Sequence, residues 1–226
     1  RLRTGHSTFE QINQFSKEVK SLENNLLPEG SDLSTFIGKF FSSLQEIAAA
    51  PEDSAPRTVA MEAGKDMVNS FNDYATRLKQ SQEGTFSQSN LAIDKINLLS
   101  NELANINNRL KSAGATKTAN DLLDTRDLLL ETLSKEIEFT TSYGDRGDVT
   151  LRLGNSGQGP ILVSPNKAFN LRAKVTENSD FRYAFEQTVN NISIFIVEGT
   201  SETATTQITG GKIAGLVNYY AYVQEV

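Results

Sequence analysis

Hydrophobic residues recur every three or four positions over the first 138 residues, which is the period of amphipathic helices. One such run covers about residues 8–26, and a second follows the turn at Pro28 and Gly30 and closes at Pro51. A further run covers about residues 118–134. The apolar positions of these three predicted helices are Phe9, Ile12, Phe15, Val19, Leu22 and Leu26, then Leu33, Phe36, Ile37, Phe40, Phe41, Leu44 and Ile47, then Leu122, Leu123, Leu129, Leu130 and Leu133.

The stretch from about residue 56 to residue 112 is unusual because it contains no proline after Pro56, the turn residue Gly84 lies between its two apolar sets, and Gly114 follows its end. Two apolar sets repeat there at spacings of three and four, the period of a coiled-coil seam, with a polar stretch and a one-residue slip of register between them. We interpret the stretch as one helix of about 80 Å, and a break at Gly84 into two antiparallel helices is the alternative. The two sets are Met67, Phe71, Tyr74 and Leu78, then Ile96, Leu99, Leu103, Ile106 and Leu110, and the polar stretch contains Ser81, Thr85 and Gln88.

After Ile137 the hydrophobic period changes to two, which is typical of β-strands. Clusters of turn residues at 144–147, 154–159 and 177–180 separate these segments and indicate a small antiparallel β domain of five or six strands. The alternating residues lie within 149–153, 171–175, 181–185 and 192–196. The paired glycines Gly210 and Gly211 then predict a hinge, and a helical period resumes from Ile213 to Val223.

These patterns predict an α+β fold. It combines an elongated antiparallel helical bundle, which has one very long helix, with a small antiparallel β domain, after which the chain returns to the bundle. We expect a helical rod-like domain at 1–138, a β domain at 139–208 and the start of a return helix at 209–226. The chain opens on Arg1 and stops within a helical pattern, so we expect a fragment of a longer protein.

Composition restricts the possible chemistry. The 226 residues carry 22 basic and 28 acidic side chains, a net charge of −6, which argues against a nucleic-acid partner. There is no cysteine, and His6 is the one histidine, so disulfides, thiolate catalysis and cysteine-bound metals are excluded. No apolar run is long enough to span a membrane. We expect no cofactor and no catalysis, a solvated His6, and a structural or binding role.

Two features of the helix at 118–134 stand out. Asp121, Asp124, Asp127 and Glu131 form a stripe at spacings of three and four, which we interpret as a solvated acidic face rather than a metal site. Arg126 lies among four leucines at helical spacing, and we expect it to make an ion pair or carbonyl contact with a neighbouring helix.

Three stretches of the chain together resemble the family of the first hook-associated protein of bacterial flagella, FlgK. The first is Asn120-Asp-Leu-Leu-Asp-Thr-Arg-Asp127, the second is the run from Phe36 to Ala50 followed by a proline-containing loop, and the third is Gly210-Gly-Lys-Ile-Ala-Gly-Leu216. Ala119 and Thr125 depart from residues that the family usually has there. The motif residues are Asn120, Asp121, Leu122, Leu123, Asp124, Arg126, Asp127, Gly210, Gly211 and Gly215.

The resemblance implies a structural protein at the junction between flagellar hook and filament, exported through the flagellar secretion channel to the outside of the cell. Its implied partners are copies of itself in a junction ring, the hook protein, the second junction protein, and the export apparatus and chaperone through termini outside this chain. No nucleic acid or membrane partner is implied. We expect subunit contacts through the acidic stripe, including Glu131, and through the long helix near Arg77 and Lys79.

Other identities fit parts of the pattern. A secreted coiled-coil adhesin would keep the long helix but would need no helix after Gly211. The second junction protein or a flagellin would share rod-like helices but lack the motif at 120–127. Without further segments we expect this chain to be a monomer.

Overall fold

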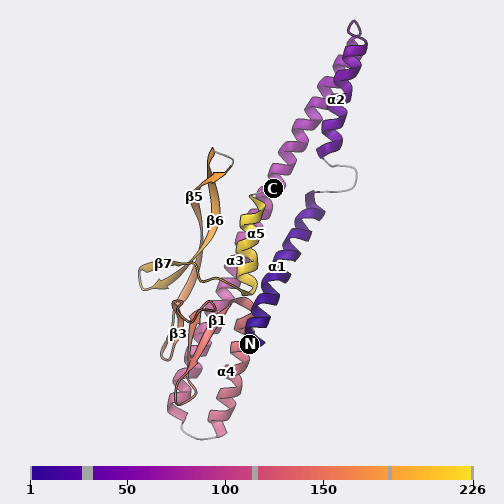
Figure 1. Ribbon diagram of the computed structural model, residues 1–226. Coiled ribbons are helices and arrows are strands. Elements are labelled where there is room, and N and C mark those ends of the chain that lie inside the picture. Colours follow the sequence, from indigo (N-terminus) through magenta and orange to yellow (C-terminus); the bar gives the residue numbers. More distant parts are fainter. Residues whose placement is uncertain (1, 27–32, 114–116, 183–184, 225–226) are drawn as a thin grey trace. The chain divides into compact units, whose positions relative to one another are not determined.

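The computed structural model describes residues 2–26, 33–113, 117–182 and 185–224. Its α+β fold confirms the predicted class (Figure 1). The helices are α1 (Leu2–Leu26), α2 (Leu33–Ala49), α3 (Ser54–Ala113), α4 (Lys117–Glu136) and α5 (Gly211–Val223). The strands are β1 (Phe139–Tyr143), β2 (Val149–Leu153), β3 (Ile161–Ser164), β4 (Lys167–Ala168), β5 (Asn170–Arg182), β6 (Phe185–Glu198) and β7 (Ser201–Thr205).

The chain divides into two compact units. Unit 1 comprises Arg1–Glu18 together with Gly84–Val226, and unit 2 comprises Val19–Glu83. Each unit is described by itself below.

Helix α3 is one unbroken helix of 60 residues, so the single-helix interpretation is confirmed and the break at Gly84 is wrong. A Cβ atom on Gly84 would meet nothing within 4 Å, so this exposed glycine costs only its conformational entropy, about 1 kcal/mol relative to alanine. The polar stretch that follows meets polar partners. Thr85 is buried, and Gln88 lies within hydrogen-bond distance of Gln14 and Glu18 on α1. The predicted end at Gly114 lies outside the described residues.

The core of unit 1 is built on the second half of α3. Its whole predicted seam is buried, and leucines of α4, side chains of α5 and inward-facing residues of both sheets pack against it. These include Ile96, Leu103, Leu130, Leu133, Leu151, Leu162, Ile194, Ile213 and Leu216. The apolar face predicted for α4 is confirmed, since four of its five leucines are buried and Leu123 is partly buried against the core.

Two antiparallel sheets lie in unit 1, with strand orders β1-β2-β3-β4 and β5-β6-β7. The predicted turns at 144–147 and 154–159 do connect strands, but the predicted turn at 177–180 is wrong. There β5 continues in unbroken register with β6, from Glu177 opposite Asn190 to Arg182 opposite Phe185. Cross-strand pairing satisfies the backbone of these turn-forming residues and overrides their local preference.

The predicted strand count is also too low, because seven strands form in the described residues. Strand β4 has two residues, which are too few to show an alternation of hydrophobic and polar positions. Strand β7, Ser-Glu-Thr-Ala-Thr, is a mostly exposed edge strand with no large apolar residue, so it shows no hydrophobic alternation.

The N-terminal half of α1 buries a polar face instead of its predicted apolar one. Phe9 and Ile12 are 64% and 63% exposed, whereas Ser7, Gln14 and Glu18 are buried. The Ser7 hydroxyl donates to the carbonyl oxygen of Ser134 on α4 at 2.6 Å, and the side chains of Gln14 and Glu18 lie 3.5 and 3.4 Å from that of Gln88 on α3. Hydrogen bonds therefore fix which face of this helix turns inward. In the same helix His6 is half-buried rather than solvated, and its Nδ1 has no hydrogen-bond partner among the described residues.

Unit 2 contains the end of α1, all of α2 and the first half of α3. Helix α3 begins at Ser54, where the Asp53 carboxylate accepts a hydrogen bond from the backbone N–H of Ala55. Few side chains of the described part of this unit are buried: Leu22, Leu26, Ser43, Ala60 and Ser70. The hairpin of α2 and α3 therefore encloses very little core.

No described helix combines the length and the hydropathy that a bilayer-crossing segment requires.

Candidate subunit-contact surfaces

Arg126 joins helix α4 to the turn between β1 and β2. Its Nη1 donates to the carbonyl oxygen of Gly147 at 2.5 Å, and its guanidinium lies 5.1 Å from the ring centre of Tyr143. Nε and Nη2 donate to Asp127 at 3.1 and 2.9 Å. The expected carbonyl contact exists, but a β-turn provides it rather than a helix. The adjacent Asp127 supplies a carboxylate from the same helix, which spacing rules of three and four overlook.

The turn accepts this contact because Gly147 adopts φ +81°, a conformation that side chains disfavour. A Cβ atom there would lie 2.7 Å from Leu123 and 3.2 Å from Arg126 Nη1. Arg3 on α1 completes the cluster, because its guanidinium donates to the Tyr143 hydroxyl at 3.0 Å and lies 3.6 Å from Asp127. Arg126 is only 9% exposed, so its role is to fix helix and turn together.

The four acidic residues of the predicted stripe on α4 are exposed, as the sequence predicts, together with Asn120. Asp127 is paired within the chain, and Glu131 lies 3.5 Å from Lys135. Asp121 and Asp124 complete the stripe. Among the described residues no group of three or more carboxylate or histidine side chains is arranged to hold a metal ion.

The glycines at the start of α5 are packed closely. Gly211 has φ +81°, and a Cβ atom there would lie 2.4 Å from the backbone nitrogen of Ile137. A Cβ atom on Gly215 would lie 2.5 Å from the carbonyl oxygen of Gln11 on α1. Gly210 accepts a hydrogen bond from the backbone N–H of Glu138 at 3.2 Å. This packing indicates a fixed junction in place of the predicted hinge, and it brings α5 against α1.

Glu138 organises the same junction and was not singled out from the sequence. Its side chain is buried and accepts a hydrogen bond from Thr209 at 2.6 Å, while its carbonyl oxygen accepts one from Gly154 at 3.0 Å. This buried carboxylate therefore ties the link between α4 and β1 to the segment just before α5.

Two asparagines of α3, also missed from the sequence, each pair with a strand as another strand would. Asn97 donates to the carbonyl oxygen of Leu171 at 3.0 Å and accepts from its N–H at 2.7 Å. Asn107 makes the same two bonds with Val149 at the start of β2. Asn107 stands among the apolar residues of the long helix at spacings of three and four, and this polar interruption is the signal that would have identified it.

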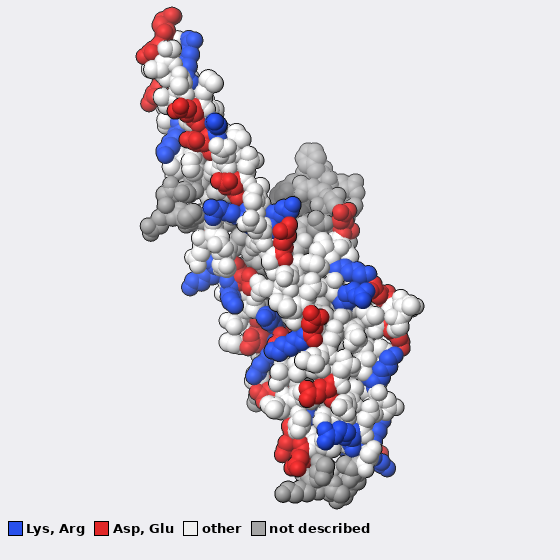
Figure 2. Space-filling model, turned by 180° about the vertical axis from the view of Figure 1, so that it is seen from behind, with Lys and Arg blue, Asp and Glu red and all other residues white. Residues whose placement is uncertain are grey.

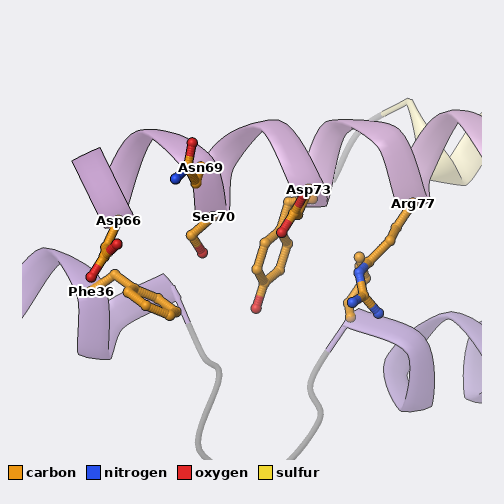
Figure 3. A pocket seen from close by; sticks show the side chains of 8 residues that line it. Phe36, Asp66, Asn69, Ser70, Asp73 and Arg77 are labelled. Carbon is orange, nitrogen blue, oxygen red and sulfur yellow. The ribbon is translucent and has the colours of Figure 1, made fainter. Parts of the chain in front are cut away.

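In unit 2, Arg77 and Lys79 are both exposed, and Arg77 is engaged within the chain. Arg77 Nη1 donates to the carbonyl oxygen of Asn25 at 2.6 Å, near the C-terminus of α1, where a positive charge is favourable. Arg77 also lines a polar pocket of about 350 Å³ on α3, with Asp66 and Asp73 among its other lining residues (Figure 3).

The surface carries both signs of charge. Acidic and basic side chains are interspersed over the face shown in Figure 2, and neither sign forms a large region there. Large apolar side chains are also exposed, on α1, α2, α3 and α4. Among those at least 50% exposed are Phe9, Ile12, Phe41, Met61, Val68, Leu91, Leu98 and Leu128.

Residues 6–225 match the family model described as the flagellar hook-associated protein FlgK helical domain. The chain is 29% identical to flagellar hook-associated protein 1 of Salmonella typhimurium over 160 residues, which are 70% of this chain and 28% of that protein. It is 25% identical to the Escherichia coli protein of the same name over 209 residues, or 90% of this chain and 36% of that protein. The corresponding Bacillus subtilis protein is 23% identical over 86% of this chain and 39% of its own length.

The fold is similar to that of the flagellar hook junction protein FlgK from Burkholderia pseudomallei. The TM-score is 0.79 at 22% sequence identity, and the match covers 96% of this chain and 38% of the other. The chain thus spans between a quarter and two fifths of the length of these relatives.

Proposed function

We propose that this chain, which belongs to the family of flagellar hook-associated protein FlgK helical domains, is part of a structural protein that joins the flagellar hook to the filament. The observation that carries the proposal is the family match from residue 6 to residue 225, since it includes the helices, the β region and the return helix in one order. A role in contact rather than catalysis agrees with the interspersed surface charge and with the exposed apolar side chains.

The same proposal divides the chain into a helical part at 1–138, a β part at 139–208 and a return helix from 209. The elements support these limits, because α4 ends at Glu136, strands occupy Phe139–Thr205, and α5 begins at Gly211. The bidentate contacts of Asn97 and Asn107 hold the two sheets on α3.

The proposed partners are copies of the protein in a ring, the hook protein and the second junction protein. Export to the cell exterior would use the flagellar secretion apparatus and a chaperone. All the candidate contact residues are exposed, and Asp121, Asp124 and Lys79 best support an intermolecular role, because their side chains form no ion pair among the described residues. Arg77, Asp127 and Glu131 already have partners within the chain and serve its own structure first.

Deletion of the gene that encodes the chain tests the proposal. Electron microscopy of the deletion strain should show hooks without filaments, and the intact gene supplied in trans should restore the filaments. Hooks that still carry full filaments would overturn the proposal.

A further inference from the structure

We propose that one side of the α2–α3 hairpin in unit 2 docks on the opposite side of the same hairpin in a second copy of the chain. This inference rests on the proposed function, in which copies assemble side by side. It names the surfaces that would meet.

The first side is apolar. The ring of Phe40 lies over Gly64, where an added Cβ atom would approach it to 3.2 Å, so Phe40 and Gly64 mark this side of the hairpin. Met61 and Val68 lie three residues before and four residues after Gly64, and they therefore share its face of α3. We call this surface the apolar side. Its exposed residues are Phe41, Leu44, Met61, Val68 and Phe71, with exposed fractions of 58%, 41%, 77%, 54% and 47%.

The opposite side carries a groove of about 400 Å³ between the two helices. Phe36, Val59 and Ala63 provide its apolar wall. We call this surface the groove side, and its charged lining residues are Lys39, Glu46, Glu62 and Asp66. The groove is large enough to receive an aromatic or methionine side chain.

The two sides have opposite charge. Basic residues flank the exposed stripe of α3: Arg57 stands four residues before Met61, Lys65 four residues after it, and Lys79 eleven residues after Val68. The groove side has three carboxylates and one lysine. In the proposed contact, the apolar side with its basic residues meets the groove side with its carboxylates. This charge complementarity favours pairing of the two different sides over pairing of two identical sides.

Contact between two different sides of one chain is heterologous, so each copy keeps one free side and the series can close into a ring. Face-to-face pairing of two apolar sides would stop at a dimer. The five exposed side chains present on the order of 500 Å², below the roughly 800 Å² per partner of a stable interface. The contact should therefore form where copies are already held side by side, while the isolated chain stays monomeric.

The 226 residues contain no cysteine, so the thiols introduced below are the only ones in this part of the protein. Val68→Cys places a thiol on the apolar side, Val59→Cys places one on the groove side, and Asn105→Cys is an exposed control in unit 1. Residues 59 and 68 are about 13.5 Å apart along one helix, so a bismaleimide with a shorter spacer cannot join them within one chain. The variants are placed in the full protein, and intact flagella are treated.

The double variant Val59→Cys/Val68→Cys should give a ladder of multimers, whereas each single variant should match the Asn105→Cys control. Adding Met61→Asp to the double variant should remove the ladder. Dimers from Val68→Cys alone, or a double variant that remains monomeric, would overturn the inference. An immunoblot of the same flagella separates the two proposals. If the protein is present without the ladder, only the docking fails, and if the protein is absent, the proposed function fails as well.

Discussion

Asn107 on α3 holds both backbone groups of Val149: its side-chain amide donates to the Val149 carbonyl oxygen at 2.8 Å and accepts from the Val149 N–H at 2.9 Å. Asn107 is fully buried, so no water can replace these bonds. Asn107→Ala should therefore reduce the free energy of unfolding by about 3 kcal/mol, since it leaves a buried donor and a buried acceptor unpaired.

Urea unfolding followed by circular dichroism measures this loss. Asn105→Ala is the matched control, because Asn105 is an exposed asparagine of the same helix. Equal unfolding midpoints for the two variants would show that the asparagine contact does not hold the sheet.

Arg126 should contribute to stability through its bond to the Gly147 carbonyl oxygen. Arg126→Ala should lower the free energy of unfolding by about 2 kcal/mol and clearly lower the melting temperature. Arg126→Lys should recover part of the loss, because a lysine keeps the charge but cannot reach the carbonyl and Asp127 together. The exposed Arg109→Ala is the control. An unchanged melting curve for Arg126→Ala would refute this account of the cluster.

Two glycines with positive φ can be compared, Gly199 between β6 and β7 and Gly211 at the start of α5. Gly199 has φ +61° with open space at its Cβ position, whereas Gly211 has φ +81° and no room beside Ile137. Gly199→Ala should cost about 1 kcal/mol from backbone strain alone. Gly211→Ala should cost about 3 kcal/mol or more, because a steric clash adds to the strain. Thermal unfolding of both variants tests the difference, and equal costs would contradict the close packing of α5.

Gly84 should be replaceable with a gain in stability. The residue is exposed within α3, and an added methyl group meets nothing within 4 Å. Gly84→Ala should raise the free energy of unfolding by up to about 1 kcal/mol and the melting temperature by about 2–4 °C. A lower melting temperature would mean that the backbone is not helical at this position.

The ion pair between Lys174 on β5 and Glu202 on β7 should depend on pH. The hydrogen bond from Lys174, aided by the charge of Arg172, lowers the pKa of Glu202 below its usual range. A lowered pKa means that the stabilisation is present above the pKa of the unfolded chain and is lost as pH falls through the folded pKa. NMR titration of Glu202 should show this low pKa, and Lys174→Met should raise it. A pKa that does not respond to Lys174→Met would exclude the pair in solution.

The spacing of hydrophobic residues alone predicted much of the helical structure. The seam from Ile96 to Leu110 is buried as a heptad-like period requires, and the unpaired-looking Arg126 correctly pointed to a carbonyl contact. Local sequence signals gave wrong predictions where contacts between residues distant in sequence determine the structure. Phe9 and Ile12 are exposed because contacts of Ser7 with α4 and of Gln14 with Gln88 on α3 orient α1, and the expected turn at 177–180 is instead paired strand.

The candidate site was the least predictable part for a related reason. A sequence motif identifies a set of residues, but it does not show whether those residues contact the same chain or another subunit. Asp127 and Arg77 looked like contact residues, yet both are engaged internally. The apolar side of the α2–α3 hairpin is visible only once Phe40 is seen to lie over Gly64.

The most direct test of a junction role is the position of the protein on the flagellum. Gold-labelled antibodies raised against this 226-residue chain can be imaged by electron microscopy on isolated flagella. The account predicts label at one place on each flagellum, the boundary between hook and filament. Label distributed along the filament, or no label on flagella that carry complete filaments, would contradict it.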